Sequence, residues 1–325
     1  MRRSVLGHYW TVTPHVIHAL RPERVPRDEP WDLTLQDPLH GEVRLTGWMR
    51  APAASRELVV IVHGLGGHAD SRYVVRTARA AHELQLSYLR VNLRGADKSG
   101  EDLYHAAMTS DLRAILASPS LARFDRIVLV GWSMGGHLVL RWAAEPERDP
   151  RVRAVVAVCA PLDLSLAARA IQRPFGRPYQ WHVLRALKAA YRHVATRRAL
   201  PVGAEAAERI TTILEWDERI VVPRFGFADR DAYYATASVG PILRDVALPA
   251  LFVAAEDDPM VTADPLRRWL AEHGPSNGGA VEAVWTGRGG HVGFPDDLDL
   301  GVGAPGAIEP QILRWAISRT ITSAR

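Results

Sequence analysis

One serine stands between two glycines at the end of a strand-like run. The segment GWSMGG covers residues 131–136 and directly follows the apolar run RIVLV. A chain that leaves a strand and enters a helix at one residue gives that residue a positive φ, and side chains two positions away on either side would collide. Gly131 and Gly135 remove those collisions. The segment therefore predicts a sharp turn that presents the hydroxyl of Ser133 as a candidate nucleophile.

A serine hydroxyl becomes a good nucleophile only beside a base that a carboxylate orients. After a strand–serine–helix turn, the acid and then the histidine are expected in loops behind later strands. The run LFVAAEDD ends at Asp258, and VEAVWTGRGG is followed by His291. We predict Ser133 as nucleophile, His291 as general base and then acid, and Asp258 as the orienting carboxylate. Asp257 is the alternative acid, and the following turn DPMV favours Asp258.

A tetrahedral intermediate also needs two hydrogen-bond donors for its negatively charged oxygen. These donors are commonly the N–H of the residue after the nucleophile and an N–H of the loop behind an early strand. The loop HGLGG, residues 63–67, follows the apolar run ELVVIV. We therefore predict the backbone N–H groups of Leu65 and Met134 as the oxyanion hole.

Short apolar runs rich in Val, Ile and Leu alternate with helix-like segments along the chain. The runs lie near residues 57–64, 87–96, 126–132, 154–164, 248–257 and 281–286. This alternation predicts an α/β fold with a mostly parallel central sheet covered by helices on both faces. A mostly helical stretch from about 165 to 246 interrupts it. We interpret residues 1–325 as one domain with a helical insertion, a candidate lid over the carboxyl edge of the sheet.

Composition excludes several classes of protein. In 325 residues, 47% are hydrophobic and 23% charged, which is typical of a soluble globular protein. The net charge of +4 comes from scattered arginines without a basic run, which argues against a nucleic-acid surface and permits weak attraction to anionic membrane surfaces. The single cysteine, Cys159, forms no intrachain disulfide and is predicted as a core residue. Without a secretion signal or a membrane-spanning run, we predict a cytoplasmic location.

The sequence gives weaker signals for two other kinds of site, a dinucleotide site and a metal site. The loop GLGGHA, residues 64–69, fits a dinucleotide fingerprint, but the next strand-like run, LSYLRVNLRG, ends without the acidic residue that would hold a ribose. The 13 histidines include no i, i+4 pair with a glutamate, so we predict surface or loop histidines, His63 among them. The sequence therefore predicts neither a cofactor nor a metal.

Longer motifs resemble the YheT-type branch of the α/β-hydrolases, which includes mammalian abhydrolase-domain lipases. The resemblance covers nearly the whole chain and rests on these segments: GHYWTVTP, HGLGGHADSRYV, RVNLRGADKSG, YHAAMTSDL, GWSMGGHLVLRW, WDERIVVPRFGFADRDAYYATAS, AAEDDPMV and GGHVGF. The segments RGADKSG and YHAAMTSDL depart from the family pattern, which bears on substrate choice more than on chemistry. The resemblance implies the α/β-hydrolase fold, serine-dependent hydrolysis of carboxylic esters, and triad positions at Ser133, Asp258 and His291.

The predicted substrate is a small ester with a short- to medium-chain apolar acyl group. Apolar and aromatic residues of the insertion favour this: Phe175, Tyr179, Trp181, Leu184, Leu187 and Tyr191. An acyltransferase or a thioesterase would use the same triad, and a catalytically idle binding protein would keep the fold without the chemistry. These alternatives, and the oligomeric state, stay open at the level of sequence.

Overall fold

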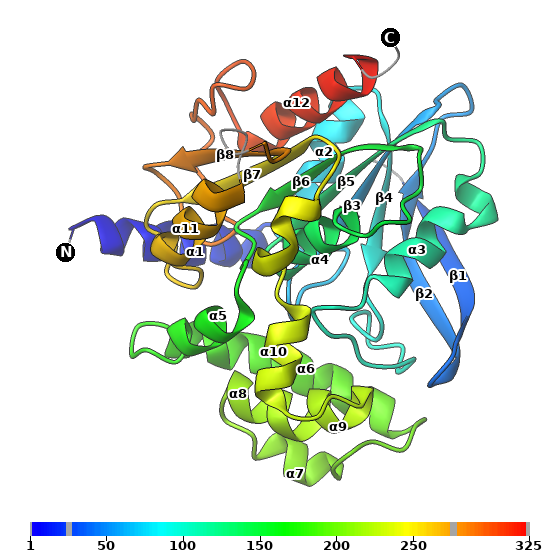
Figure 1. Cartoon of the computed structure of the whole chain (residues 1–325), viewed down its shortest axis with the longest axis vertical. Helices are drawn as coiled ribbons and strands as arrows, with labels where there is room; N and C mark the ends of the chain where they lie inside the picture. The colour runs from blue at the N-terminus through cyan, green and yellow to red at the C-terminus, as the bar shows by residue number, and fades with distance from the viewer. Residues whose placement is uncertain (1, 24–27, 274–277, 323–325) are drawn as a thin grey trace.

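The computed structural model describes residues 2–23, 28–273 and 278–322, which form one central sheet surrounded by helices (Figure 1). The strands are β1 Glu29–Asp37, β2 Gly41–Arg50, β3 Glu57–Val62, β4 Ser87–Asn92, β5 Arg126–Trp132, β6 Val152–Val158, β7 Ala250–Ala255 and β8 Val281–Thr286. Their order in the sheet is β1-β2-β4-β3-β5-β6-β7-β8. Strand β2 is antiparallel to β1 and β4, and the others pair in parallel. The predicted mostly parallel sheet is confirmed.

Side chains of the central strands alternate between two apolar cores. In β3, Leu58, Val60 and Val62 belong to one core, while Val59 and Ile61 belong to the other. Helices α2 (Arg72–Glu83) and α12 (Ile308–Thr322) cover the second core, and α3 (Ser110–Ala117), α4 (Met134–Ala143) and α11 (Ala263–His273) cover the first. A strand buried on both faces is apolar at most positions, which is why the parallel strands were recognisable as nearly continuous apolar runs.

Helices fill the chain between β6 and β7. These are α5 Leu164–Ala170, α6 Arg177–Ala195, α7 Ala204–Glu208, α8 Ile213–Trp216, the π-helical turn Asp217–Val221, α9 Val222–Phe225, α10 Arg230–Ala237 and the 3₁₀ turn Gly240–Asp245. In Figure 1, α5 to α10 gather at the lower end of the molecule. Helix α6 lies against the loops that follow β3 and β4, because Cβ atoms added at Gly66 and Gly100 would stand 3.2 Å from Ala186 Cβ and 2.7 Å from the His193 carbonyl oxygen. The helices therefore pack on the carboxyl edge of the sheet.

Three N-terminal elements had no counterpart among the expected elements. Helix α1 spans Arg2–Leu20 and contains Pro14, and strands β1 and β2 form the antiparallel end of the sheet. Only one residue of β1, Trp31, is buried. A strand with so few buried positions lacks the apolar signal of the central strands.

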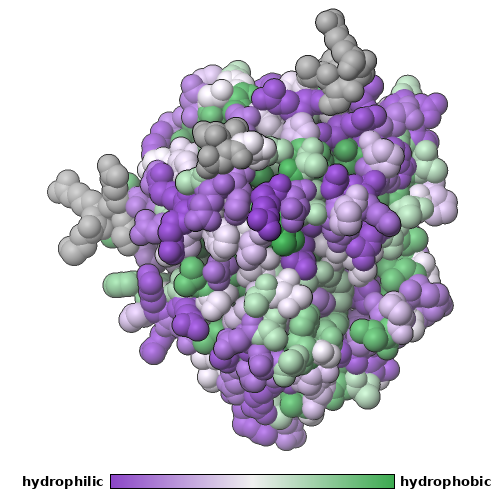
Figure 2. All heavy atoms as spheres, in the orientation of Figure 1, coloured by the Kyte–Doolittle hydropathy of each residue, from purple (hydrophilic) through white to green (hydrophobic). Residues whose placement is uncertain are grey.

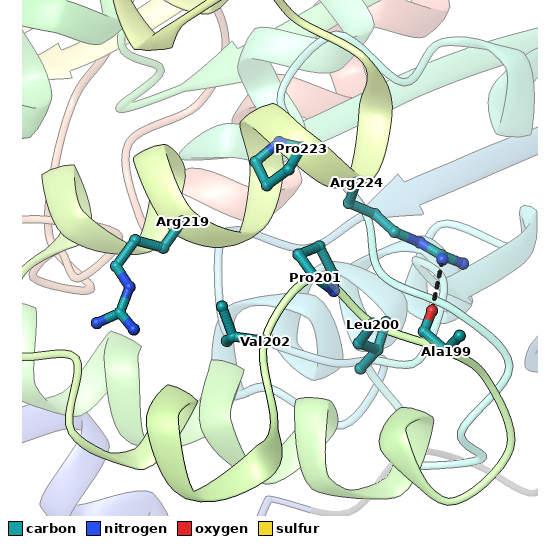
Figure 3. Close-up of a pocket in the computed structure, with 7 residues that line it drawn as sticks. All are labelled: Ala199, Leu200, Pro201, Val202, Arg219, Pro223 and Arg224. Atoms are coloured by element: carbon teal, nitrogen blue, oxygen red, sulfur yellow. Dashed lines mark hydrogen bonds between the residues drawn. The ribbon is translucent and has the colours of Figure 1, made fainter.

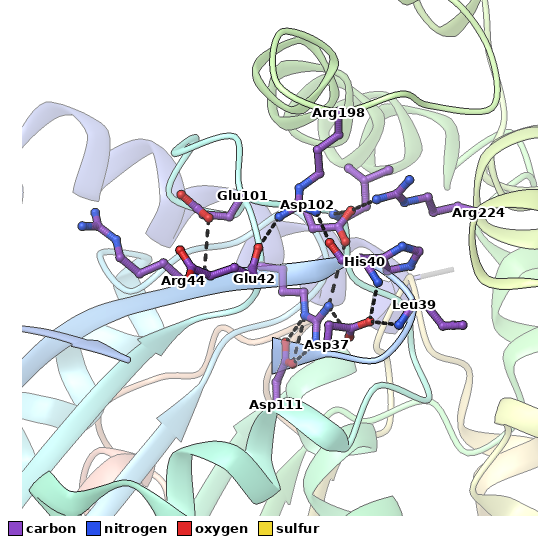
Figure 4. A network of polar contacts seen from close by, with 12 residues as sticks. Asp37, Leu39, His40, Glu42, Arg44, Glu101, Asp102, Asp111, Arg198 and Arg224 are labelled. Carbon is purple, nitrogen blue, oxygen red and sulfur yellow. Dashed lines mark hydrogen bonds and ion pairs between the residues drawn. The ribbon is translucent and has the colours of Figure 1, made fainter. Parts of the chain in front are cut away.

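A buried charge network joins the start of the sheet to the helical segment (Figure 4). Arg94 follows β4 and is fully buried; it donates three hydrogen bonds to Asp111, at 2.6, 2.9 and 2.9 Å, and lies 2.7 Å from Asp37. Asp102, also fully buried, lies 3.9 Å from Arg94 and accepts a 2.8 Å hydrogen bond from Arg224 of α9. Burial raises the pKa of Asp111, and the neighbouring Arg94 guanidinium opposes this by stabilising the charged carboxylate.

We expect Arg94→Met to lower the free energy of unfolding by about 3–5 kcal/mol, because buried carboxylates lose their cation. Urea unfolding at pH 7 measures this change. Arg192→Met removes an exposed ion pair with Glu208 at 3.3 Å and is the matched control, with an expected loss of about 0–1 kcal/mol. Equal losses in the two variants would contradict the assigned role of the buried cluster.

Candidate active site

The turn between β5 and α4 has the strained geometry that the glycine spacing predicts. Ser133 has φ 52° and ψ −119°. A Cβ atom at Gly131 would stand 2.2 Å from the Gly135 carbonyl oxygen, and one at Gly135 would stand 2.3 Å from that of Val62. Any side chain at either position would therefore force the turn apart. The strain holds the Ser133 hydroxyl at the carboxyl end of β5, at the start of α4.

Ser133, His291 and Asp258 form one hydrogen-bonded chain, although they come from three distant segments. Ser133 Oγ donates to His291 Nε2 over 2.8 Å, and His291 Nδ1 donates to Asp258 Oδ2 over 2.9 Å. This assignment puts the ring proton on Nδ1, because a carboxylate only accepts. His291 and Asp258 are buried. The geometry suits transfer of the serine proton to the imidazole.

Asp258 is held in place by its own loop. Its Oδ1 accepts hydrogen bonds from the N–H groups of Met260 at 2.8 Å and Val261 at 2.9 Å. These bonds point the other carboxylate oxygen at His291. The structure thus brings Asp258, and not the neighbouring Asp257, into contact with the imidazole.

The loop of residues 63–67 lies directly against Ser133, because a Cβ atom at Gly64 would stand 2.9 Å from Ser133 Cβ. Gly64 N–H donates to the Tyr73 hydroxyl at 3.0 Å, and Gly66 N–H donates to the Tyr104 hydroxyl at 2.9 Å. Within the described part of the chain, the N–H groups of Leu65 and Met134 donate to no protein acceptor. Two buried tyrosines thus occupy the neighbouring donors and leave the two predicted oxyanion donors available.

His63 lies in this loop, as predicted, but it is buried rather than at the surface. Its side chain is fully buried; Nδ1 donates to the Gly64 carbonyl at 2.7 Å and Nε2 accepts from Leu93 N–H at 3.1 Å. Both nitrogens are satisfied only in the neutral ring. Burial lowers the pKa of His63 to about 4, and the ring joins the loops behind β3 and β4.

This arrangement predicts a pH-dependent stability. The pKa of His63 is about 4 in the folded chain and 6.5 ordinarily. Between pH 4 and 6.5, His63 is therefore protonated in the unfolded chain and neutral in the folded chain. The stability that wild type has over His63→Gln should therefore be greatest above pH 7 and shrink as the pH falls from 6.5 towards 4. Urea unfolding of both proteins across this range measures it. A difference that stays constant or grows on acidification would contradict the buried neutral ring.

The histidine loop is supported by α1, which the sequence interpretation missed. Thr11 Oγ1 accepts the His291 N–H at 2.8 Å. Cβ atoms at Gly290 and Gly293 would stand 2.2 and 2.1 Å from the carbonyl oxygens of Gly7 and Trp10. The two glycines therefore allow α1 to lie directly against this loop. Helix α1 therefore positions the loop that carries the imidazole.

Cys159 is a buried core residue, as predicted, and lies close to the acid and the histidine. Its Sγ, a carboxylate oxygen of Asp258 and a ring nitrogen of His291 lie within 4.8 Å of one another, the one such group of possible metal ligands in the described ranges. Burial raises the pKa of the Cys159 thiol well above its ordinary value, which disfavours the thiolate that binds metals. We therefore assign Asp258 and His291 to the hydrogen-bonded chain and no metal to this group.

The apolar residues of the candidate lid differ in burial. Leu184, Leu187 and Tyr191 are buried in the core, whereas Phe175 and Trp181 are 77% and 62% exposed. A pocket of about 470 Å³ lies within the helical segment and is lined by Ala199, Leu200, Pro201, Val202, Arg219, Pro223 and Arg224 (Figure 3). The three hydrogen-bonded residues do not line it, so it is distinct from the candidate active site.

A family model described as the alpha/beta hydrolase family matches residues 59–300. The chain belongs to this family. Among its relatives, the Escherichia coli (strain K12) protein named "Putative esterase YheT" is 30% identical over 264 residues, covering 76% of this chain and 74% of the relative. Human phospholipase ABHD3 is 25% identical, covering 76% of this chain and 60% of its own length. The expected YheT-type resemblance is confirmed.

A solved structure gives the same fold for this hydrolase. The Pyrococcus furiosus esterase Pf2001 superposes with a TM-score of 0.54 at 17% identity, over 83% of this chain and 90% of that chain. At this identity the likeness concerns the fold alone. Among the described helices, none is long and apolar enough to cross a bilayer.

Proposed function

We propose that this hydrolase cleaves carboxylic esters through an acyl-enzyme formed on Ser133. The observation that carries the proposal is the unbroken chain from the Ser133 hydroxyl through His291 to Asp258, with links of 2.8 and 2.9 Å. His291 takes the serine proton as Oγ attacks the ester carbonyl, and the alcohol leaves with that proton. Water then enters, His291 takes a proton from it, and the acid is released as Ser133 is restored.

Two backbone donors stabilise the intermediate in this proposal. The N–H groups of Leu65 and Met134 bind the oxygen that becomes negative in the tetrahedral state, each contributing about 3–4 kcal/mol. The support is that Tyr73 and Tyr104 take the N–H groups on either side of Leu65. Met134 opens α4, where the helix dipole also favours negative charge.

Helices α5 to α10 act as a lid over this site and, in the proposal, accept a short- to medium-chain apolar acyl group. Val183 and Ala186 of α6 are the nearest neighbours of the loop at Gly66, with Ala186 Cβ 3.2 Å from a Cβ added there. This gives the loop beside Leu65 an apolar neighbour. Phe175 and Trp181 point to solvent and are not part of this contact.

A series of p-nitrophenyl esters from acetate to palmitate tests the substrate class. We expect measurable hydrolysis with a maximum in kcat/KM at short to medium chains, because an enclosed apolar site gains about 0.8 kcal/mol per buried methylene until it is full. Flat rates across the series would contradict the apolar acyl site. Mass spectrometry of the products with acyl thioesters and added alcohols present distinguishes the alternatives, since a transferase would yield mainly new esters and a thioesterase would prefer thioesters.

A further inference from the structure

Helix α1 is apolar on the side that faces away from the protein. Val5, Tyr9, Val12, Val16 and Leu20 recur at helical spacing and are 64%, 51%, 46%, 51% and 78% exposed. Their spacing places them in one stripe along the helix. The opposite side carries Gly7, Thr11 and Pro14, which are buried. Two more exposed residues, Leu6 and Ile17, flank the stripe.

The start of the helical segment continues this apolar surface. His8 of α1 stacks on Tyr179 of α6 with ring centroids 5.7 Å apart and lies 6.0 Å from the ring of Phe175. Phe175 and Trp181 are themselves exposed, and we take the exposed apolar side chains of α1 and of the start of the helical segment as one candidate surface. We call it the α1–α6 face, and it comprises Val5, Leu6, Tyr9, Val12, Val16, Ile17, Leu20, Phe175 and Trp181. The face visible in Figure 2 instead mixes hydrophilic and hydrophobic residues.

The two stretches of chain that form the α1–α6 face carry charges of one sign. Neither residues 2–22 nor residues 164–204 contain an aspartate or glutamate. Four exposed arginines, Arg169, Arg173, Arg177 and Arg185, lie in the second stretch, and in the described ranges none of them is within ion-pair distance of a carboxylate. Arg185 lies 5.4 Å from the centre of the Trp181 ring. The apolar side chains are therefore bordered by unpaired positive charge.

We propose that the α1–α6 face docks this hydrolase on the surface of an anionic phospholipid bilayer. Apolar and aromatic side chains bordered by arginines match the interfacial region of such a membrane, where acyl chains lie beneath negative headgroups. No described helix is able to span a bilayer, so α1 would lie along the surface. A second copy of this chain fits less well, because a twofold contact would oppose the same arginines.

Docking would bring the membrane next to the candidate active site. The buried side of α1 holds the histidine loop through the 2.8 Å bond from His291 N–H to Thr11. Helix α6, the other half of the face, lies against the loop of Leu65. Hydrolysis of a lipid ester taken from the bilayer would depend on the proposed function. Docking on the bilayer does not depend on it.

Cosedimentation with vesicles tests docking without using activity. Full-length Ser133→Ala protein is mixed with phosphatidylglycerol–phosphatidylcholine vesicles or with phosphatidylcholine vesicles, at low and high salt. We expect binding to the anionic vesicles that weakens as salt rises, and weak or no binding to neutral ones. Wild type should bind equally well, so failure of the catalytic proposal leaves this result unchanged.

Variants locate the binding surface. We expect Tyr9→Ser/Val16→Ser and Arg173→Gln/Arg177→Gln each to weaken vesicle binding by about tenfold or more. The matched controls are Leu39→Ser, which is 72% exposed elsewhere, and Arg244→Gln. Circular dichroism melting verifies that each variant is folded. Absence of binding to anionic vesicles at low salt, equal losses in the controls, or a dimer in ultracentrifugation that the Tyr9→Ser/Val16→Ser variant abolishes would overturn the proposal.

Discussion

Replacing Ser133 by alanine should lower kcat for ester hydrolysis by about 10⁴-fold or more while leaving the protein folded. The variant loses the atom that forms the acyl-enzyme, so only binding and the oxyanion donors remain. Steady-state assays of p-nitrophenyl butyrate hydrolysis measure the decrease in kcat. The variant should stay folded because alanine keeps the Cβ atom of serine. The close packing at the neighbouring glycines should hold residue 133 at its positive φ as in wild type.

Ser55→Ala is the matched control, because Ser55 precedes β3 at the other end of the sheet and its hydroxyl donates to the Glu57 carbonyl at 3.0 Å. We expect its kcat to stay within about twofold of wild type, as for most surface changes away from a site. Wild-type rates in the Ser133→Ala variant would show that Ser133 is not the nucleophile.

The second large effect separates two neighbouring acids. Asp258→Asn should lower kcat/KM by about 10⁴-fold, because an amide in this place favours the wrong imidazole tautomer and loses the stabilising charge. Asp257→Asn should stay within about twofold of wild type, since His291 Nδ1 contacts only Asp258 of the pair. Steady-state kinetics of both variants measures the split.

The two substitutions are matched in size and charge, so each serves as the control of the other. A large fall in Asp257→Asn with a small one in Asp258→Asn would reassign the acid. Equal falls would indicate that the loop as a whole, rather than one carboxylate, supports His291.

The parallel part of the fold was predictable because its strands are buried on both faces. The run RIVLV followed by GWSMGG predicts β5, the turn and α4 without reference to the rest of the chain. By contrast, β1 and β2 expose alternate residues at the end of the sheet, and α1 contains Pro14. Helix α1 depends on contacts with the histidine loop, and such tertiary contacts leave no local pattern.

The candidate active site likewise has parts that the sequence pattern predicts and parts that depend on tertiary contacts. The order of Ser133, Asp258 and His291 along the chain follows from loops behind successive strands, so sequence reasoning reached the three residues that the structure brings together. Tyr73, Tyr104 and Thr11 arrange the surrounding backbone through single hydroxyls, those of Tyr104 and Thr11 from remote segments. All three lie in motifs of the family resemblance, which is the one signal that marked them.

Intact-mass analysis after treatment with a fluorophosphonate tests whether Ser133 is an activated nucleophile, because only an activated serine reacts rapidly with this probe. We expect one added phosphonyl group, mapped to Ser133 by peptide sequencing, with labelling lost in Ser133→Ala and strongly slowed in His291→Ala. Wild-type protein that stays unlabelled, or a label mapped to a different residue, would contradict it.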